Sequence, residues 1–386
     1  METRIPFLEV SDAIIYSGGE SLYWCMQCGL CTGTCPYRLV PGEASEEFNV
    51  RRVQRLGQLG LEGFESENCL FACTTCRACV NVCPRGVDII GNVRGMRRML
   101  AEAGTIPASL KPIAGSLHSQ GNPWSGPRDK RIEWTKGVDV PTFSQDAEYF
   151  LFVCCTSCFD ARSQKIARAV TKSLMAAGIS FGIIGNEESC CGESIRKVGD
   201  EDLFQKLAAS NIELFNSKGV KKIITTGPHC LFTFKNEYPE LGGEYEVFHY
   251  TQILNEAYKA GKLKFNGEAV GPISFHDPCY LGRHSEIFDP PRELMAALPG
   301  SDPKELVRNQ KQSLCCQGGG GRVWMETKAG ERFAELRISE ALDAGAKTLA
   351  TACPYCITML EDTCKVLGKQ DVLEVLDLSE VIAARV

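Results

Sequence analysis

A cysteine run that occurs twice near the start of the chain places the strongest limit on its fold. In each copy three cysteines are separated by two residues, and a fourth follows after three more residues, directly before a proline. The copies are Cys25, Cys28, Cys31, Cys35 and Cys73, Cys76, Cys79, Cys83. Thiolates are soft ligands that suit iron–sulfide clusters, and this doubled run is typical of a domain with two [4Fe–4S] cubanes. Structural zinc sites do not need the doubled run with its proline.

The cysteine before each proline is expected to ligate the other cluster, as it does in two-cluster ferredoxins. The sequence therefore predicts two ligand sets, which are Cys25, Cys28, Cys31, Cys83 and Cys73, Cys76, Cys79, Cys35. Cys69 lies outside the pattern, and we expect it to be a small buried hydrophobic residue.

The cysteine content stands out against an otherwise ordinary composition, with 21 cysteines in 386 residues. The chain start lacks the basic and then apolar stretch of a leader peptide, so we expect metal ligation and not a disulfide framework. The net charge of −6 favours neither nucleic acid nor an anionic membrane as a partner. No apolar run approaches the roughly 18 residues of a membrane span. We therefore expect a cytoplasmic protein that meets a membrane only through a partner.

The order of expected elements divides the chain into four parts. Residues 1–103 are predicted to form a helical two-[4Fe–4S] ferredoxin-like domain, with a helix over 43–61. Residues 104–147, rich in proline and glycine, are predicted to be an extended linker. Beyond them, expected strands (149–153, 180–184, 221–226, 272–276, 348–352) alternate with expected helices (160–177, 203–215, 331–342). Such alternation predicts α/β domains with mainly parallel sheets over 148–266 and 267–386, and thus a chain of the α+β or α/β class.

The later cysteines are spaced alike in the two α/β domains. Between Cys155 and Cys190 lie 34 residues, and between Cys279 and Cys315 lie 35. Cys190 and Cys315 each begin an adjacent pair of cysteines. We interpret this spacing as an internal duplication.

The cysteine that follows each pair sets the end of the repeat. From Cys191 to Cys230 there are 38 intervening residues, and from Cys316 to Cys353 there are 36. This spacing aligns Cys230 with Cys353. Thr233 would then stand where the second domain has a further cysteine, Cys356.

These motifs resemble those of the CCG-domain family. The resemblance is carried by Cys190-Cys191-Gly192, Pro228-His229-Cys230, His276-Asp277-Pro278-Cys279, Cys315-Cys316 with glycines 318–321, and Ala352-Cys353-Pro354-Tyr355-Cys356. With the ferredoxin-like domain in front, nearly the whole chain is similar to the D subunit of heterodisulfide reductase, in which the C and B subunits of the soluble enzyme are fused. The same arrangement occurs in iron–sulfur subunits of glycolate or lactate oxidases, of sulfite-reduction membrane complexes and of benzoyl-CoA reductase complexes. In the second domain Gln317 replaces the glycine of the first, and we expect glycines 318–321 to give the backbone the same room one residue later.

The resemblance implies clusters in both α/β domains. In the second domain it implies a noncubane [4Fe–4S] cluster, of the kind that attacks a disulfide in heterodisulfide reductase, on Cys279, Cys315, Cys316, Cys353 and Cys356. The regular set of the first domain suits a further [4Fe–4S] cluster or an incomplete site, and consists of Cys155, Cys190, Cys191 and Cys230. Cys158 is an open candidate for a fifth ligand there, whereas Cys154 and Cys364 are expected to be structural. The soluble enzyme uses two complete sites, so an incomplete first site favours an electron relay over disulfide reduction.

The chain is therefore predicted to be an iron–sulfur electron-transfer subunit of a multisubunit anaerobic oxidoreductase. The expected partners are a flavoprotein like that of heterodisulfide reductase (HdrA type), a cytochrome b or quinone-linked subunit, or an acyl-CoA reductase, because no flavin or nicotinamide fingerprint is present. One alternative is a disulfide reductase of the CoM-S-S-CoB type that acts at the noncubane site. Another is an iron–sulfur subunit of a glycolate or lactate oxidase or of a benzoyl-CoA reductase complex. A metal-stabilised scaffold without redox function is disfavoured by the eight cysteines of the doubled run.

Two histidines stand beside predicted ligands. His229 precedes Cys230, and His276 lies three residues before Cys279. Either could tune a cluster by a hydrogen bond to it. Either could equally be a satisfied core histidine at the end of a strand, and the same two alternatives apply to His249.

Overall fold

The computed structural model describes residues 5–386, which form two compact units. The first unit consists of the described residues up to Ala114 together with two later segments, Ser194–Asp202 and Gln317–Phe333. The second unit consists of Gly115–Glu193, Leu203–Cys316 and Ala334–Val386. Residues 1–4, which belong to the start that we interpreted as lacking a leader peptide, lie outside the described residues.

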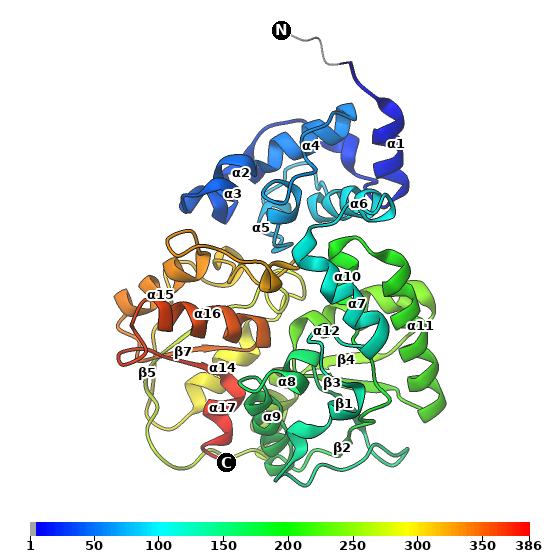
Figure 1. Cartoon of the computed structure of the whole chain (residues 1–386). Coiled ribbons are helices and arrows are strands. Elements are labelled where there is room, and N and C mark those ends of the chain that lie inside the picture. Colours follow the sequence, from blue (N-terminus) through cyan, green and yellow to red (C-terminus); the bar gives the residue numbers. More distant parts are fainter. Residues whose placement is uncertain (1–4) are drawn as a thin grey trace. The chain divides into compact units, whose positions relative to one another are not determined.

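The first unit is helical around the two cysteine runs, as predicted. Its helices are α1 (Leu8–Tyr16), α2 (Leu30–Thr34), α3 (Glu43–Glu47), α4 (Val50–Leu59), α5 (Ala78–Asn81) and α6 (Ile89–Glu102), and most of α10 (Glu193–Val198) belongs to it as well (Figure 1). Helix α6 runs on directly from the second cysteine run. One of its faces is buried, with Val93, Met96 and Leu100 at helical spacing.

The single helix expected over 43–61 is two helices. The side chain of Asn49 accepts a hydrogen bond from the backbone N–H of Arg52 at 3.0 Å, and so caps a new helix, α4. Gly60 ends α4 with a positive φ of 60°. An asparagine inside an apolar pattern thus acts as a helix start.

The second unit contains two four-stranded parallel sheets, as predicted for α/β domains. The first sheet has the order β2-β1-β3-β4 and the second the order β6-β5-β7-β8. The strands are β1 (Tyr149–Phe152), β2 (Phe181–Gly182), β3 (Lys222–Thr225), β4 (Glu246–His249), β5 (Gly271–Phe275), β6 (Ser301–Pro303), β7 (Thr348–Thr351) and β8 (Glu374–Asp377). Each sheet therefore repeats the same topology, which supports the internal duplication.

Helices connect the strands of both sheets, and a last helix follows β8. They are α8 (Cys155–Phe159), α9 (Gln164–Ala176), α11 (Glu201–Lys218), α12 (Pro228–Phe232), α13 (Tyr250–Lys259), α14 (Asp289–Ala297), α15 (Phe333–Asp343), α16 (Pro354–Val366) and α17 (Leu378–Ala383). The stretch 104–147 is not wholly extended, because it contains α7 (Lys111–Gln120). In α7 the buried Ile113 and Leu117 are four residues apart, and Pro112 lies in the first turn, where a helix tolerates proline.

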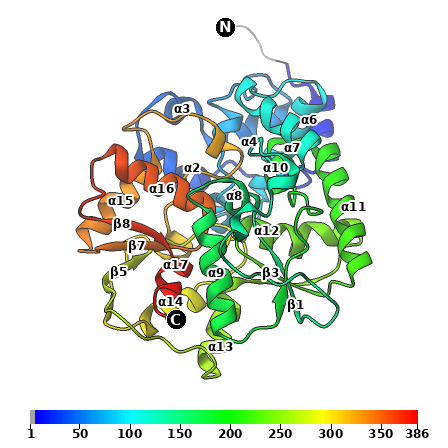
Figure 2. The ribbon, with the colours of Figure 1, turned by 60° about the horizontal axis from the view of Figure 1, so that its bottom comes forward.

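The two α/β domains pack against each other through matched helices. Helix α9 of the first domain packs on α17 of the second, and α13 of the first packs on α14 of the second. Figure 2 shows α9 and α17 side by side. Arg162, just before α9, donates to Glu361 at 2.6 Å and to Glu380 at 2.9 Å. In each contact, a helix that follows the first strand of one domain packs on a helix that follows the last strand of the other. Helices α9 and α14 follow the first strands, and α13 and α17 follow the last.

Candidate metal centres

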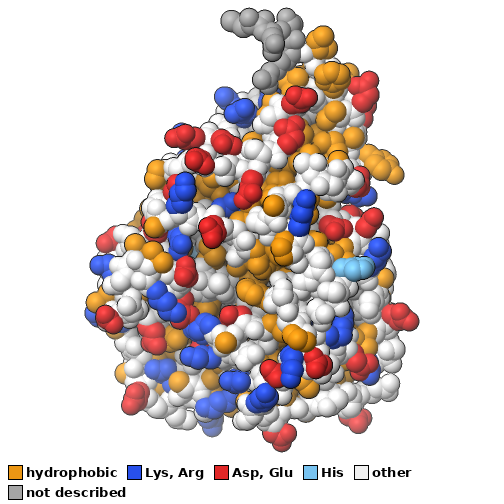
Figure 3. Space-filling view, in the orientation of Figure 1, with side chains coloured by type: hydrophobic (Ala, Val, Ile, Leu, Met, Phe, Trp, Pro, Cys, Tyr) orange, Lys and Arg blue, Asp and Glu red, His pale blue; other side chains and the backbone are white. Residues whose placement is uncertain are grey.

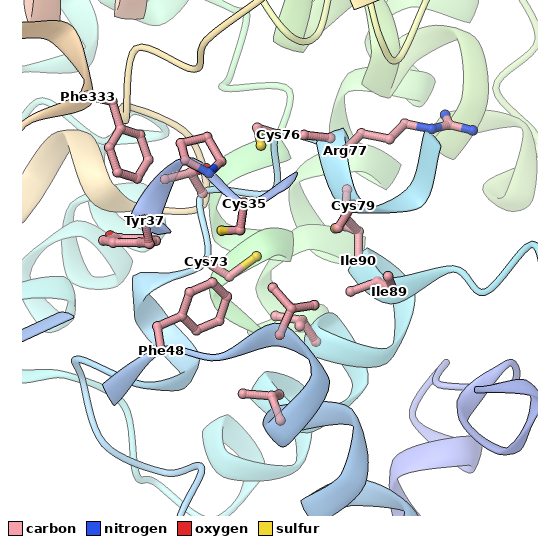
Figure 4. A pocket seen from close by; sticks show the side chains of 16 residues that line it. Cys35, Tyr37, Phe48, Cys73, Cys76, Arg77, Cys79, Ile89, Ile90 and Phe333 are labelled. Atoms are coloured by element: carbon pink, nitrogen blue, oxygen red, sulfur yellow. The ribbon is translucent and has the colours of Figure 1, made fainter. Parts of the chain in front are cut away.

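A cavity in the first unit is lined by four of the predicted cluster ligands. Cys35 comes from the first cysteine run, and the other three, which come from the second run, are Cys73, Cys76 and Cys79. Figure 4 shows the sulfur atoms of Cys35 and Cys73 directed into the same space. Apolar side chains of this unit complete the wall, so the thiols meet in a largely dry environment.

A second cavity of the first unit gathers the other four cysteines, which are Cys25, Cys28, Cys31 and Cys83. Two of the sulfur atoms accept hydrogen bonds. The side-chain amide of Gln27 donates to Cys25 Sγ at 3.4 Å, and the backbone N–H of Val87 donates to Cys83 Sγ at 3.4 Å. The fourth cysteine of each run thus lies with the three cysteines of the other run.

The two cysteine loops share an unusual backbone. In the first loop Gln27 and Gly29, which flank the second cysteine, have φ angles of 62° and 87°. At the matching places of the second loop, Thr75 and Arg77 have φ angles of 53° and 66°. Residues other than glycine rarely adopt this left-handed conformation, which costs roughly 1–2 kcal/mol per residue. Such strain persists where the surrounding structure imposes it, as it does in loops that close around a ligand.

The chemistry of these thiols fits an iron–sulfur cluster. Burial raises the pKa of Cys79 well above its ordinary value, and Cys73 and Cys76 raise it further. Burial likewise raises the pKa of Cys31. Several thiolates can share such a space only if a cation offsets their charge. The iron of a cluster would supply that charge.

One of the two cavities lies near the surface of the first unit. Cys28 is exposed, whereas Cys73 and Cys76 at the other cavity are buried. Apolar side chains beside the first cysteine loop are also exposed, with Trp24 at 56% and Met26 at 61%. Figure 3 shows further hydrophobic side chains gathered over α1 of the same unit.

Arg97 joins the separate segments of the first unit. Its buried guanidinium donates to the carbonyls of Leu70 at 2.8 Å and Cys73 at 2.7 Å, beside the second cysteine run. It also donates to the carbonyls of Lys197 at 2.8 Å and Gly320 at 3.1 Å. Lys197 and Gly320 belong to the two short segments that follow the cysteine pairs of the α/β domains. One side chain therefore anchors both of these segments to the second cysteine loop.

In the first α/β domain the four predicted ligands lie together. Cys191 Sγ is 3.6 Å from Cys230 Sγ, and the side chains of Cys155 and Cys190 share a hydrogen bond. All four are buried. Cys154, which was expected to be structural, lies beside this group, because its side chain hydrogen-bonds to Cys230. The sequence pattern gave no sign of this contact, because Cys154 stands directly before a predicted ligand.

A buried ion pair supports the first domain's thiols. Arg131 donates to Cys155 Sγ at 3.4 Å, and its guanidinium lies 2.9 Å from the carboxylate of Glu188. Cys158, the open candidate for a fifth ligand, donates to the backbone carbonyl of Val153 at 3.5 Å. Neither Arg131 nor Glu188 stands out in the sequence, because both lie outside the cysteine motifs.

In the second α/β domain all five predicted ligands are buried and interact in one group. Cys356 Sγ lies 3.3 Å from Cys316 Sγ. The side chains of Cys279 and Cys315 share a hydrogen bond, as do those of Cys353 and Cys356. Burial on its own would raise the pKa of Cys353, but hydrogen bonds with Cys356 and His229 lower it to about 5. This site therefore carries one thiol that readily forms the thiolate that a metal binds.

The sheets correct the alignment of the two domains. Helices α12 and α16 both begin with a proline directly after the third strand in their sheets, and their third residues are Cys230 and Cys356. The prediction that Cys230 matches Cys353 is therefore wrong, and so is the prediction that Thr233 replaces Cys356. The segments between the cysteine pairs and these helices differ in length by only one residue, which agrees with the match of Cys230 to Cys356. The cysteine that the first domain lacks belongs just before α12.

The three histidines have different environments. Both ring nitrogens of buried His276 have no hydrogen-bond partner among residues 5–386, and its ring lies with Cys316 and Cys356 in a group whose ligand atoms are within 4.8 Å of one another. His229 hydrogen-bonds to a thiol of the second domain, as described above, and its Nδ1 lies 3.1 Å from the buried Glu193 carboxylate of the first. His249 caps α13, as a core histidine would.

Two other cysteines have environments of their own. Cys69 is buried, and burial raises its pKa to about 11, so it remains a neutral thiol. Cys364 is buried as well and donates to the backbone carbonyl of Leu373 at 3.4 Å.

Family models match both parts of the chain. The model of a 4Fe-4S dicluster domain matches residues 21–87. The model of a cysteine-rich domain, CCG, matches residues 149–235 and again 273–361. The double match agrees with the two sheets of equal topology.

Curated relatives share the same parts. A probable iron-sulfur-binding oxidoreductase, FadF, from Bacillus subtilis is 39% identical over 83% of this chain and 47% of its own length. The EtfAB:quinone oxidoreductase of Syntrophomonas wolfei is 35% identical over 88% of this chain and 49% of its own length. The D subunit of the dihydromethanophenazine:CoB–CoM heterodisulfide reductase of Methanosarcina barkeri is 29% identical over 99% of this chain and 98% of its own length. The chain thus spans about half the length of the first two relatives. Among residues 5–386 no helix is both long enough and apolar enough to span a membrane.

Proposed function

We propose that this chain relays electrons between the clusters of its 4Fe–4S dicluster domain and its two CCG domains. The chain belongs to the family of iron–sulfur oxidoreductases that combine a 4Fe–4S dicluster domain with two cysteine-rich CCG domains. The observation that carries the proposal is the grouping of thiols. Eight cysteines of the first unit line two cavities in sets of four, and the predicted ligands in the second unit form one buried group in each α/β domain.

The proposed ligands follow these groups. One cubane would be held by Cys25, Cys28, Cys31 and Cys83, and the other by Cys35, Cys73, Cys76 and Cys79. In the second α/β domain the proposed ligands of a noncubane cluster are Cys279, Cys315, Cys316, Cys353 and Cys356, and the first domain would hold a further [4Fe–4S] cluster. When bound, such clusters supply one-electron transfer. The protein binds them with thiolates, excludes water by burial and directs N–H donors at sulfur.

The surface of the first unit supports exchange of electrons with a partner at Cys28. This residue and the apolar side chains beside it, Trp24 and Met26, are exposed, and exposed apolar patches mark interaction sites. The partner would be a flavoprotein, a cytochrome b or quinone-linked subunit, or an acyl-CoA reductase. The relative named EtfAB:quinone oxidoreductase supports a quinone-linked acceptor. The protein would then work in the cytoplasm and meet the membrane through that partner.

A second candidate function is disulfide reduction at the second α/β domain. The five buried cysteines grouped there favour it, because the resemblance to heterodisulfide reductase pairs this ligand set with a noncubane cluster that attacks a disulfide. A relative whose name includes heterodisulfide reductase supports it as well. The two functions differ in what leaves the protein, which is electrons in the relay and free thiols in the reductase.

Iron analysis of anoxically purified protein tests the relay. Four clusters predict roughly sixteen irons per chain. Stepwise reduction followed by electron paramagnetic resonance (EPR) should show signals from all of them. About eight irons with ferredoxin-type signals alone would contradict clusters in the α/β domains. Incubation of the reduced protein with a mixed disulfide separates the second candidate, because release of two thiols per disulfide would favour the reductase.

A further inference from the structure

We propose that Cys154 supplies a fifth thiolate to the metal site of the first α/β domain, in place of the cysteine that this domain lacks at position 227. The inference rests on the proposed function only in assuming that this site holds an iron–sulfur cluster. It extends the four-cysteine set predicted from the sequence, so that the ligands are Cys154, Cys155, Cys190, Cys191 and Cys230.

The strand register identifies the exchanged positions. Strand β1 pairs with β3 in the first sheet as β5 pairs with β7 in the second. When the two sheets are aligned by these registers, Cys155 matches Cys279, the first predicted ligand of the second domain. The residue before this shared ligand is Cys154 in the first domain and Pro278 in the second. The residue before the helix after the third strand is Gly227 in the first domain and Cys353 in the second. Each domain therefore has one additional cysteine. In the first domain it stands before the shared ligand, and in the second it stands before the helix.

The two positions lie next to each other in space. A Cβ atom built on Gly227 would lie 3.3 Å from the Cβ of Cys154 and 3.4 Å from its Sγ. The thiol of Cys154 therefore lies where a side chain at position 227 would enter. The backbone of Gly227, with φ −135° and ψ 134°, is extended like that of Cys353, with φ −158° and ψ 122°. The loop at Gly227 thus has a conformation like that at Cys353, while the thiol beside it comes from the segment that follows β1.

The contacts of Cys154 direct it to the site. Its side chain hydrogen-bonds to Cys230, a predicted ligand. Its backbone N–H donates to the hydroxyl of Thr226 at 2.9 Å, which holds the end of β1 against the loop before α12. The side chain is buried, with 9% of its surface exposed. A buried thiol in a fixed backbone, next to other thiols, is positioned as a ligand.

Cys158 is the other candidate for a fifth ligand, and its contacts differ. Its thiol donates to the backbone carbonyl of Val153 at 3.5 Å, whereas the side chain of Cys154 hydrogen-bonds to the predicted ligand Cys230. The contacts therefore favour Cys154.

The test uses three variants of the whole chain, purified without oxygen: C154A, C158A and the double variant C154A/G227C. We expect C154A to change the Mössbauer spectrum of one cluster, while the EPR signals of the ferredoxin clusters stay as in wild type. C158A, which removes a buried thiol one helical turn away, should match wild type. C154A/G227C should restore the wild-type spectrum, because the new thiol enters the space that Cys154 leaves.

The results separate this inference from the proposed function. Wild type with roughly sixteen irons and a C154A spectrum identical to wild type would overturn the role of Cys154 alone. A changed spectrum in C158A with none in C154A would assign the fifth thiolate to Cys158. Wild type with about eight irons would contradict the proposed function itself. Should C154A not accumulate, C154S keeps the volume of the side chain and replaces it in the comparison.

Discussion

Gln317 has the same left-handed backbone as Gly192, with φ angles of 75° and 84°. Both residues directly follow a cysteine pair. The expectation that glycines 318–321 provide this freedom one residue later is therefore wrong, because Gln317 itself adopts the conformation. Its side-chain oxygen accepts a hydrogen bond from the backbone N–H of Phe333 at 2.9 Å, which offsets part of the strain. The residue after each cysteine pair therefore needs a left-handed backbone, which one domain obtains with a glycine and the other with a hydrogen-bonded glutamine.

The two turns should respond differently to substitution. A Cβ at Gly192 would lie 2.8 Å from Cδ2 of Phe204, in addition to the strain of its φ angle. We expect G192A to lower the free energy of unfolding by at least about 1–2 kcal/mol. Q317G should have a small effect, because the relief of strain and the lost hydrogen bond nearly cancel. Thermal unfolding of both variants without oxygen measures this, and a G192A midpoint equal to that of wild type would contradict it.

Removal of one ferredoxin ligand should disable one cubane. In C76S we expect a loss of about four irons and of one low-potential EPR signal, because cluster binding needs the fourth thiolate and contributes to the stability of the loop. The matched control is C69S, since Cys69 is buried nearby in sequence and remains a neutral thiol. Equal iron contents in C76S and wild type would show that Cys76 is not a ligand.

The cysteine runs and the later cysteines differ in how far the sequence predicts them. The grouping of Cys35 with the second run could be expected, because the fourth cysteine of each run ligates the other cluster in two-cluster ferredoxins. The exchange between Gly227 and Cys154 could not, because the two positions follow different strands and meet only when the sheet forms. Asn49 shows the same limit on a local scale, since its role as a cap depends on the backbone around it. Parallel sheets followed from the alternation of apolar strands and helices, which needs no such contact.

His276 should tune the cluster of the second domain. Burial lowers its pKa well below the ordinary value, so the ring is neutral and has one N–H to donate beside Cys316 and Cys356. A hydrogen bond to a cluster sulfur stabilises the reduced state. We expect H276F to shift the midpoint potential of one cluster to a more negative value, by on the order of 40 mV for a bond of about 1 kcal/mol.

An EPR-monitored redox titration measures the shift in H276F. Phenylalanine is a suitable replacement because Phe152 occupies the matching position on β1 of the first domain. The ferredoxin clusters of the same protein serve as an internal control and should keep their potentials. An unchanged potential at every cluster would show that His276 is a core residue without influence on the metal.

Asp377 and His249 occupy matching positions at the ends of β8 and β4, where each caps the following helix. Burial raises the pKa of Asp377 to about 7, against hydrogen bonds from Ser379 and Tyr250. Burial lowers the pKa of His249 to about 3, against a backbone hydrogen bond at Ala352. One cap is therefore a carboxyl group that protonates easily in the folded protein, and the other is an imidazole that resists protonation.

These shifts predict opposite effects of pH on stability. The folded state holds a proton on Asp377 that the unfolded chain releases near pH 4, so this contribution to stability is lost as the pH rises to about 7. The unfolded chain protonates His249 below about pH 6.5 whereas the folded state does not, so this contribution is lost as the pH falls. Each shift of about three units corresponds to on the order of 4 kcal/mol over its full range.

Two asparagine variants separate the contributions, because asparagine also caps helices but does not titrate. The range of pH 5.5 to 8.5 spares acid-labile clusters. Within it, the melting temperature of D377N should fall less toward neutral pH than that of wild type. H249N should flatten the decline on the acid side of about pH 6.5. The measurement is the melting temperature of wild type and both variants at each pH, without oxygen. If D377N follows the wild-type profile, the carboxyl group of Asp377 is ionised throughout this range and its burial does not govern its protonation.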